Sequence, residues 1–177
     1  MLLSYLQVVL KKLTMKYADE FFRVFNDKEL SKLVSIPNPL KKSWVKEYIE
    51  KAMFLAEKGD RYTWGVFNKE DMFVGVVLLK RIDINNKTAE LGYTMGRKYW
   101  KNGYTEMAAR AVLNHCFKKL DLNRIEVRVF MGNPESCAFV ERLNGKLEGV
   151  LREASFNSVG FNDMYLYSIL KKDYIIG

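Results

Sequence analysis

The segment from residue 88 to residue 130 constrains the fold more than any other part of the chain. It reads as a strand (TAELGYTM), a short basic turn, a helical stretch that begins near Thr105, and a second strand (RIEVRVF). Strands joined through a helix lie parallel, and such crossovers are almost always right-handed. The sequence therefore predicts one parallel strand pair with a helix packed against it.

The rest of the chain predicts antiparallel pairing around this unit. Apolar residues recur at helical spacing in 17–28 and again at 44–52, and Gly59 follows the second pattern. Further strands are expected at 6–10, 61–68, 72–82, 146–153 and 163–170, with a short helix from Pro134 to Leu143. We therefore expect an α+β fold, a mixed and mostly antiparallel sheet with helices on both faces. A length of 177 residues fits a single domain, 1–177.

The formal charge of +8 is distributed as scattered lysine pairs, at 11–12, 41–42, 118–119 and 171–172. Scattered pairs favour a small anionic ligand over a nucleic-acid surface, although an RNA-binding module stays as an alternative. The apolar N-terminal run has no basic residue before it and is shorter than the roughly 20 residues of a membrane span. We therefore expect a soluble, cytoplasmic protein.

The histidine and cysteine content argues against a metal site. The chain has one histidine, His115, and its two cysteines, Cys116 and Cys137, lack metal-ligand spacing. His115 falls on the apolar face of its helix, where a packed core histidine is the simpler interpretation. We expect no metal cofactor and no Ser-His triad.

The stretch GRKYWKNGYTEMAAR (96–110) predicts a phosphate site. A strand ends near Met95 and a helix begins near Thr105, so the turn between them presents free helix amides and a positive dipole end. Gly103 allows close approach of a ligand, and the turn carries Arg97, Lys98 and Lys101. The two common nucleotide-binding motifs, GxxxxGK[ST] and a GxGxxG that follows a strand, are both absent from the sequence. A plain turn with surface lysines is the alternative.

Two further glycine and cap signals lie beside this turn. Gly92 interrupts a strand pattern, which often marks a bulge or a close backbone approach, although a strand glycine without a special role is an equal alternative. Asn133 is suited to cap a helix with Pro134 at its first position. Ser136 then lies one turn in, where its hydroxyl could face the same mouth, although a simply well-capped surface helix explains the pattern equally.

Two carboxylates lie inside strand patterns, Glu90 in AELGY and Glu126 in IEVRV. A strand carboxylate can simply face solvent. If it lines a cleft instead, burial raises its pKa and makes it a usable general base.

Six segments in this order resemble the GNAT N-acetyltransferase superfamily, and more narrowly its ribosomal-protein N-terminal acetyltransferase branch. They are YADEFFRVFNDKEL, IPNPL, VGVVLLKRID, AELGYTMGRKYWKNGYTEMAARAVLNHCF, LNRIEVRV and NPESCAFVERLNGKLEG. The resemblance implies that acetyl-CoA is the donor, with its pyrophosphate on the turn before Gly103. It also implies a parallel strand pair that splays apart to hold the pantetheine.

The resemblance assigns roles to individual residues. The implied cofactor-binding residues are Tyr93, Thr94, Met95, Arg97, Lys98, Lys101, Asn102, Gly103, Tyr104, Thr105, Asn133 and Ser136. Lys101 replaces the first glycine of the family's phosphate turn, which predicts a less unusual backbone there and an added charge for the phosphate. Val140 stands where another branch has a tyrosine acid, so Ser136 is the candidate acid, with Asn133 positioning the pantetheine or a water. Glu126 is the first candidate base and Glu90 the second, each directly or through water.

The acceptor is expected to be an amine. An α-amine has a pKa of about 8 and a lysine amine about 10.4, so the α-amine needs weaker help from a base. A protein N-terminus is therefore favoured, with polyamines, aminoglycosides or a non-catalytic CoA-binding role as alternatives. Residues around Ser35 to Trp44 and Phe156 to Phe161 are expected to wall the acceptor cleft, in a monomer or homodimer.

Overall fold

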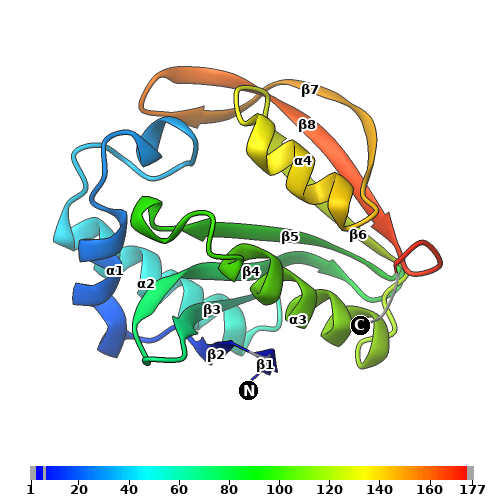
Figure 1. Cartoon of the computed structure of the whole chain (residues 1–177), viewed down its shortest axis with the longest axis horizontal. Helices are drawn as coiled ribbons and strands as arrows, with labels where there is room; N and C mark the ends of the chain where they lie inside the picture. Colours follow the sequence, from blue (N-terminus) through cyan, green and yellow to red (C-terminus); the bar gives the residue numbers. More distant parts are fainter. Residues whose placement is uncertain (1–2, 6, 175–177) are drawn as a thin grey trace.

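The computed structural model describes residues 3–5 and 7–174. In this part of the chain one eight-stranded sheet runs through the molecule in the order β1-β2-β3-β4-β5-β6-β8-β7 (Figure 1). The strands are β1 (Leu3–Tyr5), β2 (Val8–Lys12), β3 (Arg61–Asn68), β4 (Phe73–Asp83), β5 (Thr88–Met95), β6 (Arg124–Phe130), β7 (Lys146–Asn157) and β8 (Gly160–Leu170). The α-helices are α1 (Ala18–Phe25), α2 (Lys42–Glu57), α3 (Tyr104–Lys118) and α4 (Pro134–Arg142).

The predicted mixed sheet is confirmed. Among the described strands, β5 and β6 form the one parallel pair, and α3 connects them as the sequence pattern predicts. The strand expected at 6–10 lies at Val8–Lys12, while its first residue, Leu6, falls outside the described residues. The last two strands are longer than predicted, and they form a hairpin that extends to Asn157 and Gly160.

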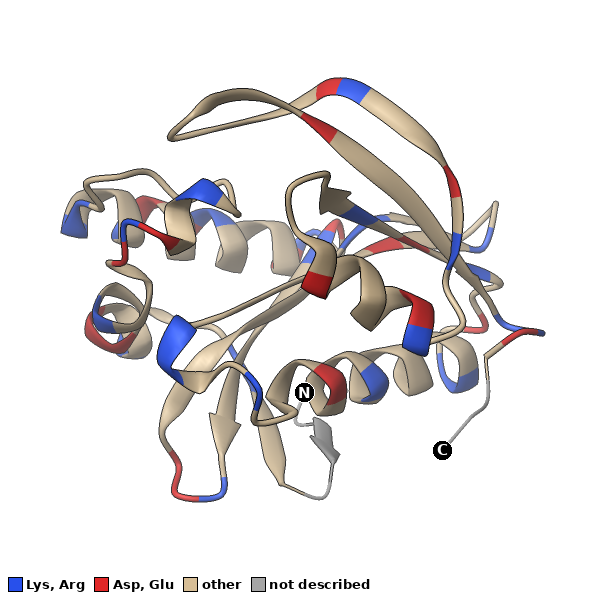
Figure 2. Ribbon diagram, turned by 45° about the horizontal axis from the view of Figure 1, so that its top comes forward, with Lys and Arg blue, Asp and Glu red and all other residues tan. Residues whose placement is uncertain are grey.

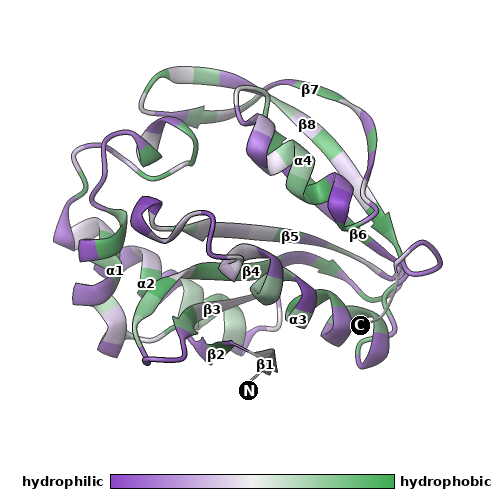
Figure 3. Cartoon of the chain, in the orientation of Figure 1, coloured by the Kyte–Doolittle hydropathy of each residue, from purple (hydrophilic) through white to green (hydrophobic). Residues whose placement is uncertain are grey.

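Helices cover both faces of the sheet because each strand alternates its apolar side chains between two cores. Val76 of β4 packs with α1 and α2, in a cluster that includes Phe21 and Ile49. Its neighbour Val77 packs on the other face, in a cluster that includes Val112 of α3 and Val140 of α4. In Figure 3 hydrophobic and hydrophilic residues accordingly alternate along α3 and α4.

The parallel pair splays apart at one end. Cα pairing between β5 and β6 runs from Thr88↔Arg124 to Leu91↔Val127 and then stops. Beyond that point β5 pairs only with β4, and β6 only with β8. The last residues of β5 therefore present one edge of unpaired backbone to the opening, and α4 begins at the end of β6, above that opening (Figure 1).

The structure corrects the bulge expected at Gly92. Gly92 pairs in regular register with Leu78, and the irregularity between β4 and β5 lies instead between Lys80 and Asp83. A Cβ at Gly92 would lie 3.0 Å from Leu78 Cδ1, so this glycine leaves room for the side chain of Leu78 on the neighbouring strand. The splay from β6, rather than a bulge, leaves the edge of β5 open.

The distribution of charge agrees with the scattered lysine pairs of the sequence. Figure 2 shows Lys and Arg distributed over helices, strands and turns rather than massed on one side. No helix in the described part of the chain is long and apolar enough to cross a membrane. Both Cys116 and Cys137 are free thiols.

Candidate active site

A cavity of about 320 Å³ lies at the splay. Its walls come from α1, α2 and the segment between them, from β3, β4, β5 and β6, from the start of α4, and from β7 and β8. Of the acceptor wall expected from the sequence, Ser35, Ile36 and Trp44 line the cavity. On the hairpin side the lining residues are Ala154, Ser155 and Met164, which flank the predicted range of 156–161.

Two hydroxyl groups meet across the splay. Tyr93 of β5 and Ser136 of α4 are hydrogen-bonded, with 2.8 Å between their oxygens, and both residues line the cavity. Ser136 is placed by the predicted cap, since its backbone amide donates to Asn133 Oδ1 at 3.1 Å. The ring of Tyr93 packs edge-on against Phe139, and burial raises the pKa of the Tyr93 phenol. The phenol therefore keeps its proton at neutral pH and can donate a hydrogen bond to Ser136 Oγ.

The resemblance implied a cofactor contact for Tyr93 but not its hydrogen bond to Ser136. Sequence alone gives no register between β5 and α4, which are 43 positions apart at these two residues. Val140, the position of a tyrosine acid in another branch, is fully buried in the core and offers no polar group.

The turn between β5 and α3 leaves helix amides available. The helix begins at Tyr104 without a side-chain cap, and the first amide to bond back into the turn is that of Met107, to Gly103 O. Within the described residues no hydrogen bond occupies the backbone amides of 101–106. The free amides of such a solvent-exposed helix start can donate hydrogen bonds to phosphate oxygens.

Lys101 adopts a backbone that the sequence analysis did not expect. Its φ is +64°, and that of Gly103 is +75°, so both residues are left-handed. The prediction of a less unusual backbone at Lys101 is therefore wrong. The turn keeps the shape that a glycine would allow, at a cost of roughly 1–3 kcal/mol for a non-glycine residue. Asn102 does not cap the helix, because its side chain donates back to Trp100 O at 3.2 Å.

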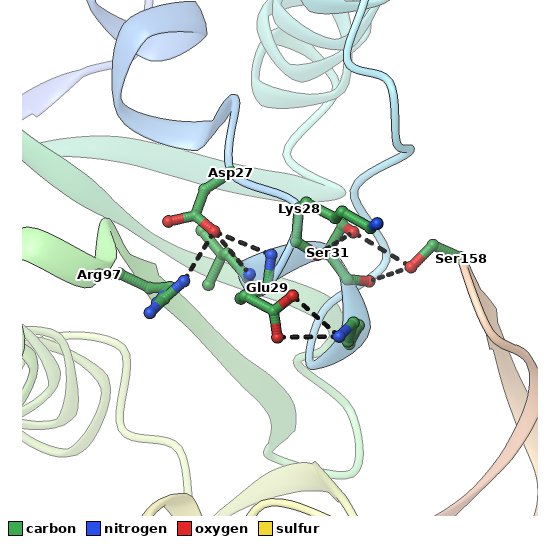
Figure 4. Close-up of polar contacts among 8 residues, drawn as sticks. Asp27, Lys28, Glu29, Ser31, Arg97 and Ser158 are labelled. Atoms are coloured by element: carbon green, nitrogen blue, oxygen red, sulfur yellow. Dashed lines mark hydrogen bonds and ion pairs between the residues drawn. The ribbon is translucent and has the colours of Figure 1, made fainter.

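Two of the basic residues in the turn already have partners. Arg97 Nη1 donates to Asp27 Oδ1 at 3.2 Å, and the same oxygen accepts from the amides of Glu29 and Leu30 (Figure 4). Lys98 Nζ lies 4.7 Å from the centre of the Tyr99 ring. Arg97 thus ties the turn to the segment that follows α1.

The same segment is bonded to the β7–β8 hairpin. Ser31 Oγ lies 3.1 Å from Ser158 Oγ, as Figure 4 shows, and Asn157 Nδ2 donates to Lys32 O at 2.7 Å. Ser35 Oγ lies 3.1 Å from Ser155 Oγ. These contacts hold the hairpin across the cavity, so the acceptor side has a roof made from two distant parts of the chain.

Glu90 lies in the cavity wall and is almost fully buried. Its side chain is 4% exposed, and three cations surround its carboxylate. Lys80 Nζ lies 2.9 Å from Oε1, while Arg81 Nη1 and Arg128 Nε lie 3.0 and 3.3 Å from Oε2. Oε2 nevertheless makes no hydrogen bond of acceptable geometry. A buried acceptor atom of this kind can take a hydrogen bond from a ligand or a water.

Glu126 does not line the cavity. It is the direct partner of Glu90 across the parallel strands. Its Oε1 accepts from Arg124 Nη2 at 3.0 Å, and Arg124 Nη1 donates to Glu148 at 2.7 Å. The structure thus brings Glu90, Ser136, Asn133 and Tyr93 to one cavity and leaves Glu126 beside it. The lone histidine, His115, is partly buried and does not line this cavity.

The cations around Glu90 were not singled out from the sequence. The alternation in RIEVRVF places Arg128 on the same face as Glu126, a signal that could have identified it. Arg81 could not have been found in this way, because alternation from Lys80 points it to the opposite face.

The sequence of the chain is similar to a known family and to named proteins. A family model described as acetyltransferase (GNAT) domain matches residues 7–146. The chain is 29% identical over 169 residues to the uncharacterized N-acetyltransferase p20 of Bacillus licheniformis, covering 95% of each chain. It is 31% identical over 116 residues to the ribosomal-protein-serine acetyltransferase of Escherichia coli (strain K12), covering 66% of this chain and 64% of that one.

A solved structure shares the fold. The microcin C7 self-immunity acetyltransferase MccE, in complex with acetyl-CoA and AMP, superposes with a TM-score of 0.84 at 24% identity. The alignment covers 93% of this chain and 92% of that chain.

Proposed function

Because the chain belongs to the GNAT acetyltransferase family, we propose that it transfers the acetyl group of acetyl-CoA directly to the N-terminal α-amine of a protein. The splayed pair, with the Tyr93 and Ser136 hydroxyls meeting in its cavity, is the observation that carries this proposal. The names of the relatives, among them a ribosomal-protein-serine acetyltransferase, support the acceptor class. The proposal takes residues 1–177 as one acetyl-CoA-dependent domain that works in the cytoplasm.

The donor would lie along the open edge of β5. The unpaired backbone of Tyr93, Thr94 and Met95 offers the pantetheine hydrogen bonds of the kind that strands make with each other. The free amides of Asn102 to Thr105, with Lys101 beside them, would take the pyrophosphate. An amide of the β5 edge would donate to the thioester oxygen as negative charge develops, which is worth roughly 3–4 kcal/mol for one preorganised donor.

The reaction then needs one bond made and one broken. The amine nitrogen attacks the thioester carbonyl carbon, and the C–S bond breaks as the C–N bond is completed. Ser136 donates its proton to the departing sulfur and is resupplied by the Tyr93 phenol. Asn133 keeps Ser136 in place through the helix cap. The proton lost by the amine passes to a carboxylate, directly or through water.

Glu90 is the better placed of the two candidate bases, because it lines the cavity and Glu126 does not. We expect Glu90→Gln to lower kcat/KM at pH 7 by about 10²-fold, and the loss to shrink at higher pH as the amine deprotonates by itself. Glu126→Gln is the matched control and retains most activity. The measurement is the pH–rate profile of both variants. A larger loss of kcat/KM in Glu126→Gln than in Glu90→Gln would instead identify Glu126 as the better candidate base.

The first experiment is acetyl transfer by the purified chain. Release of CoA thiol and the mass of the acceptor are measured with peptide N-termini, a polyamine and an aminoglycoside. The proposal predicts transfer to peptide α-amines. Transfer to none of these amines, with CoA binding retained in calorimetry, would instead identify a non-catalytic CoA-binding module.

A further inference from the structure

The side chains that line the cavity carry more positive charges than negative ones. Four cationic side chains line it, Arg61, Lys80, Arg81 and Arg128. Among the described residues that line the cavity, Glu90 is the single carboxylate. Four cations against one carboxylate leave an excess of three positive charges on this wall.

The sheet itself gathers most of these charges on one face. Arg61 pairs with Lys80 across β3 and β4, and Lys80 pairs with Glu90 across β4 and β5. Directly opposed residues of neighbouring strands point to the same face. Arg128 lies two residues beyond Glu126, the partner of Glu90 on β6, and so shares that face.

Arg81 joins the cluster through an irregularity of the backbone. It follows Lys80, so regular alternation would turn its side chain to the opposite face. The register between β4 and β5 shifts between Lys80 and Asp83, and the φ of Arg81 is +52°. This left-handed residue reaches Glu90 Oε2 at 3.0 Å. A non-glycine residue in this conformation costs energy, and its effect here is to add one cation to the wall.

The single carboxylate of Glu90 does not provide hydrogen-bond acceptors for all four cationic side chains. Arg128 Nε is buried and lies 3.3 Å from Glu90 Oε2, yet neither atom makes a hydrogen bond of acceptable geometry. Within the described part of the chain, Arg61 donates to two neutral oxygens, those of Tyr48 at 2.6 Å and Thr63 at 3.1 Å, and to no carboxylate. Guanidinium groups bind carboxylate and phosphate through several hydrogen bonds. The wall is therefore suited to a ligand that brings its own negative charge.

We propose that the acceptor carries a carboxylate or phosphate near its amino group. This inference rests on the proposed transfer to an amine and narrows its substrate class. A polyamine or an aminoglycoside would add positive charge beside four cations, which opposes binding. An acidic side chain close to a peptide N-terminus and a small amine bearing a phosphate supply the same chemistry.

Binding to the CoA-loaded protein tests the inference without relying on turnover. Calorimetry compares the amidated peptides Ser-Asp-Ala-Ala and Ser-Asn-Ala-Ala, and separately phosphoethanolamine and ethanolamine. We expect the anionic member of at least one pair to bind about tenfold more tightly, a ratio that falls with added salt. The pair that shows the preference identifies the source of the negative charge. Absence of a preference in both pairs, including absence of binding, overturns the inference.

Variants localise the effect to the wall. Arg128→Gln and Lys80→Gln should each lower the preference for the anionic ligand about threefold or more. Lys80 is 37% exposed, so its substitution tests the idea even if the Arg128 variant does not fold. Lys118→Gln removes the same charge from an exposed position on α3 and should keep the wild-type ratio. An equal loss in the Lys118 variant would show that only net charge matters and would overturn the inference.

A transfer assay with the same ligands separates the two proposals. Retained preference for the anionic ligand without acetylation of any amine would remove the proposed function and leave the binding inference standing. Acetylation with equal kcat/KM for both members of each pair would remove the inference and leave the proposed function standing.

Discussion

The hydroxyls of Tyr93 and Ser136 are expected to act as one unit in catalysis, so that removing either one lowers kcat. Ser136 can protonate a leaving sulfur only while another donor stands behind it, and the Tyr93 phenol is 2.8 Å away. We expect Ser136→Ala to lower kcat by about 10²-fold and Tyr93→Phe by about tenfold. Because residues that act in sequence are not additive, the double variant should resemble Ser136→Ala. Tyr93→Phe keeps the ring that packs on Phe139.

Steady-state kinetics of the four proteins form a double-mutant cycle. The KM for acetyl-CoA is the control and should change little. A double variant whose loss equals the product of the single losses would mean that the two hydroxyls act independently.

A second residue-scale prediction concerns Lys101, where sequence and structure differ. Lys101 directly precedes the residues whose backbone amides are free, and its own backbone is left-handed. We expect Lys101→Gly to weaken CoA binding about threefold at low salt, as for an exposed ion pair, and hardly at all near 1 M salt. Unfolding free energy should change by less than about 1 kcal/mol, because relief of strain and the entropy of glycine oppose each other.

Lys101→Asn is the matched variant for the charge. Asparagine tolerates a left-handed backbone and also removes the ammonium, so both variants should show the same salt-dependent loss in calorimetry. Unchanged affinity at low salt in both variants would show that Lys101 has no part in phosphate binding.

At the scale of elements, the close contact of β4 with β5 sets the position of the open edge. Gly75 of β4 pairs with Met95, and a Cβ there would lie 2.5 Å from Thr94 O and 2.9 Å from Met95 Cα. Backbone atoms cannot turn away as a flexible side chain can, so Gly75→Ala must displace the end of β5. We expect a loss of about 1–3 kcal/mol in unfolding free energy and about tenfold weaker CoA binding.

Gly149→Ala on β7 is the control, since a Cβ there meets nothing within 4 Å. Its unfolding free energy should stay within about 0.5 kcal/mol of the wild type. Denaturant unfolding and calorimetry with CoA measure both variants. Wild-type CoA affinity in a folded Gly75→Ala protein would show that the position of this edge is not critical.

Elements with local signals could be predicted from the sequence, and elements set by distant contacts could not. The helix α2, its Gly59 end and the Asn133 cap follow from spacing and capping chemistry within a few residues. The Glu106–Arg110 ion pair on α3, at 3.0 Å, likewise has the four-residue spacing that brings two side chains together on a helix. The roof of the cavity depends instead on serine contacts across more than a hundred residues, for which no local pattern exists.

The same distinction explains the candidate site. The splay was expected only through resemblance, because nothing in TAELGYTM itself says where pairing with β6 ends. The ranking of Glu126 over Glu90 also came from resemblance, and the structure reverses the order of proximity to the cavity. Glu90 and Glu126 are directly paired and share one face, and their partners differ: Glu90 lies among Lys80, Arg81 and Arg128, whereas Glu126 accepts from Arg124.

At the scale of the whole molecule, the tip of the β7–β8 hairpin exposes an apolar surface beside the cavity. Phe156, Val159 and Phe161 are 64%, 63% and 71% exposed, and the two phenylalanine rings lie 5.1 Å apart. The neighbouring residues Ala154 and Ser155 line the cavity. A polypeptide whose N-terminus enters the cavity would extend over this tip, whereas a small amine would not reach it.

The corresponding prediction separates protein acceptors from small ones. In Phe156→Ser/Phe161→Ser, the KM for a peptide of about 20 residues should rise about tenfold, as for loss of a modest hot spot. The KM for a dipeptide amide with the same first two residues should not change, because it ends inside the cavity. Exposed substitutions shift unfolding free energy by only about 0.5 kcal/mol, so a change in folding would not explain the difference. Equal effects on the long and short acceptors, or none on either, would mean that the hairpin tip does not contact the acceptor, and the case for a protein substrate would then depend on the relatives alone.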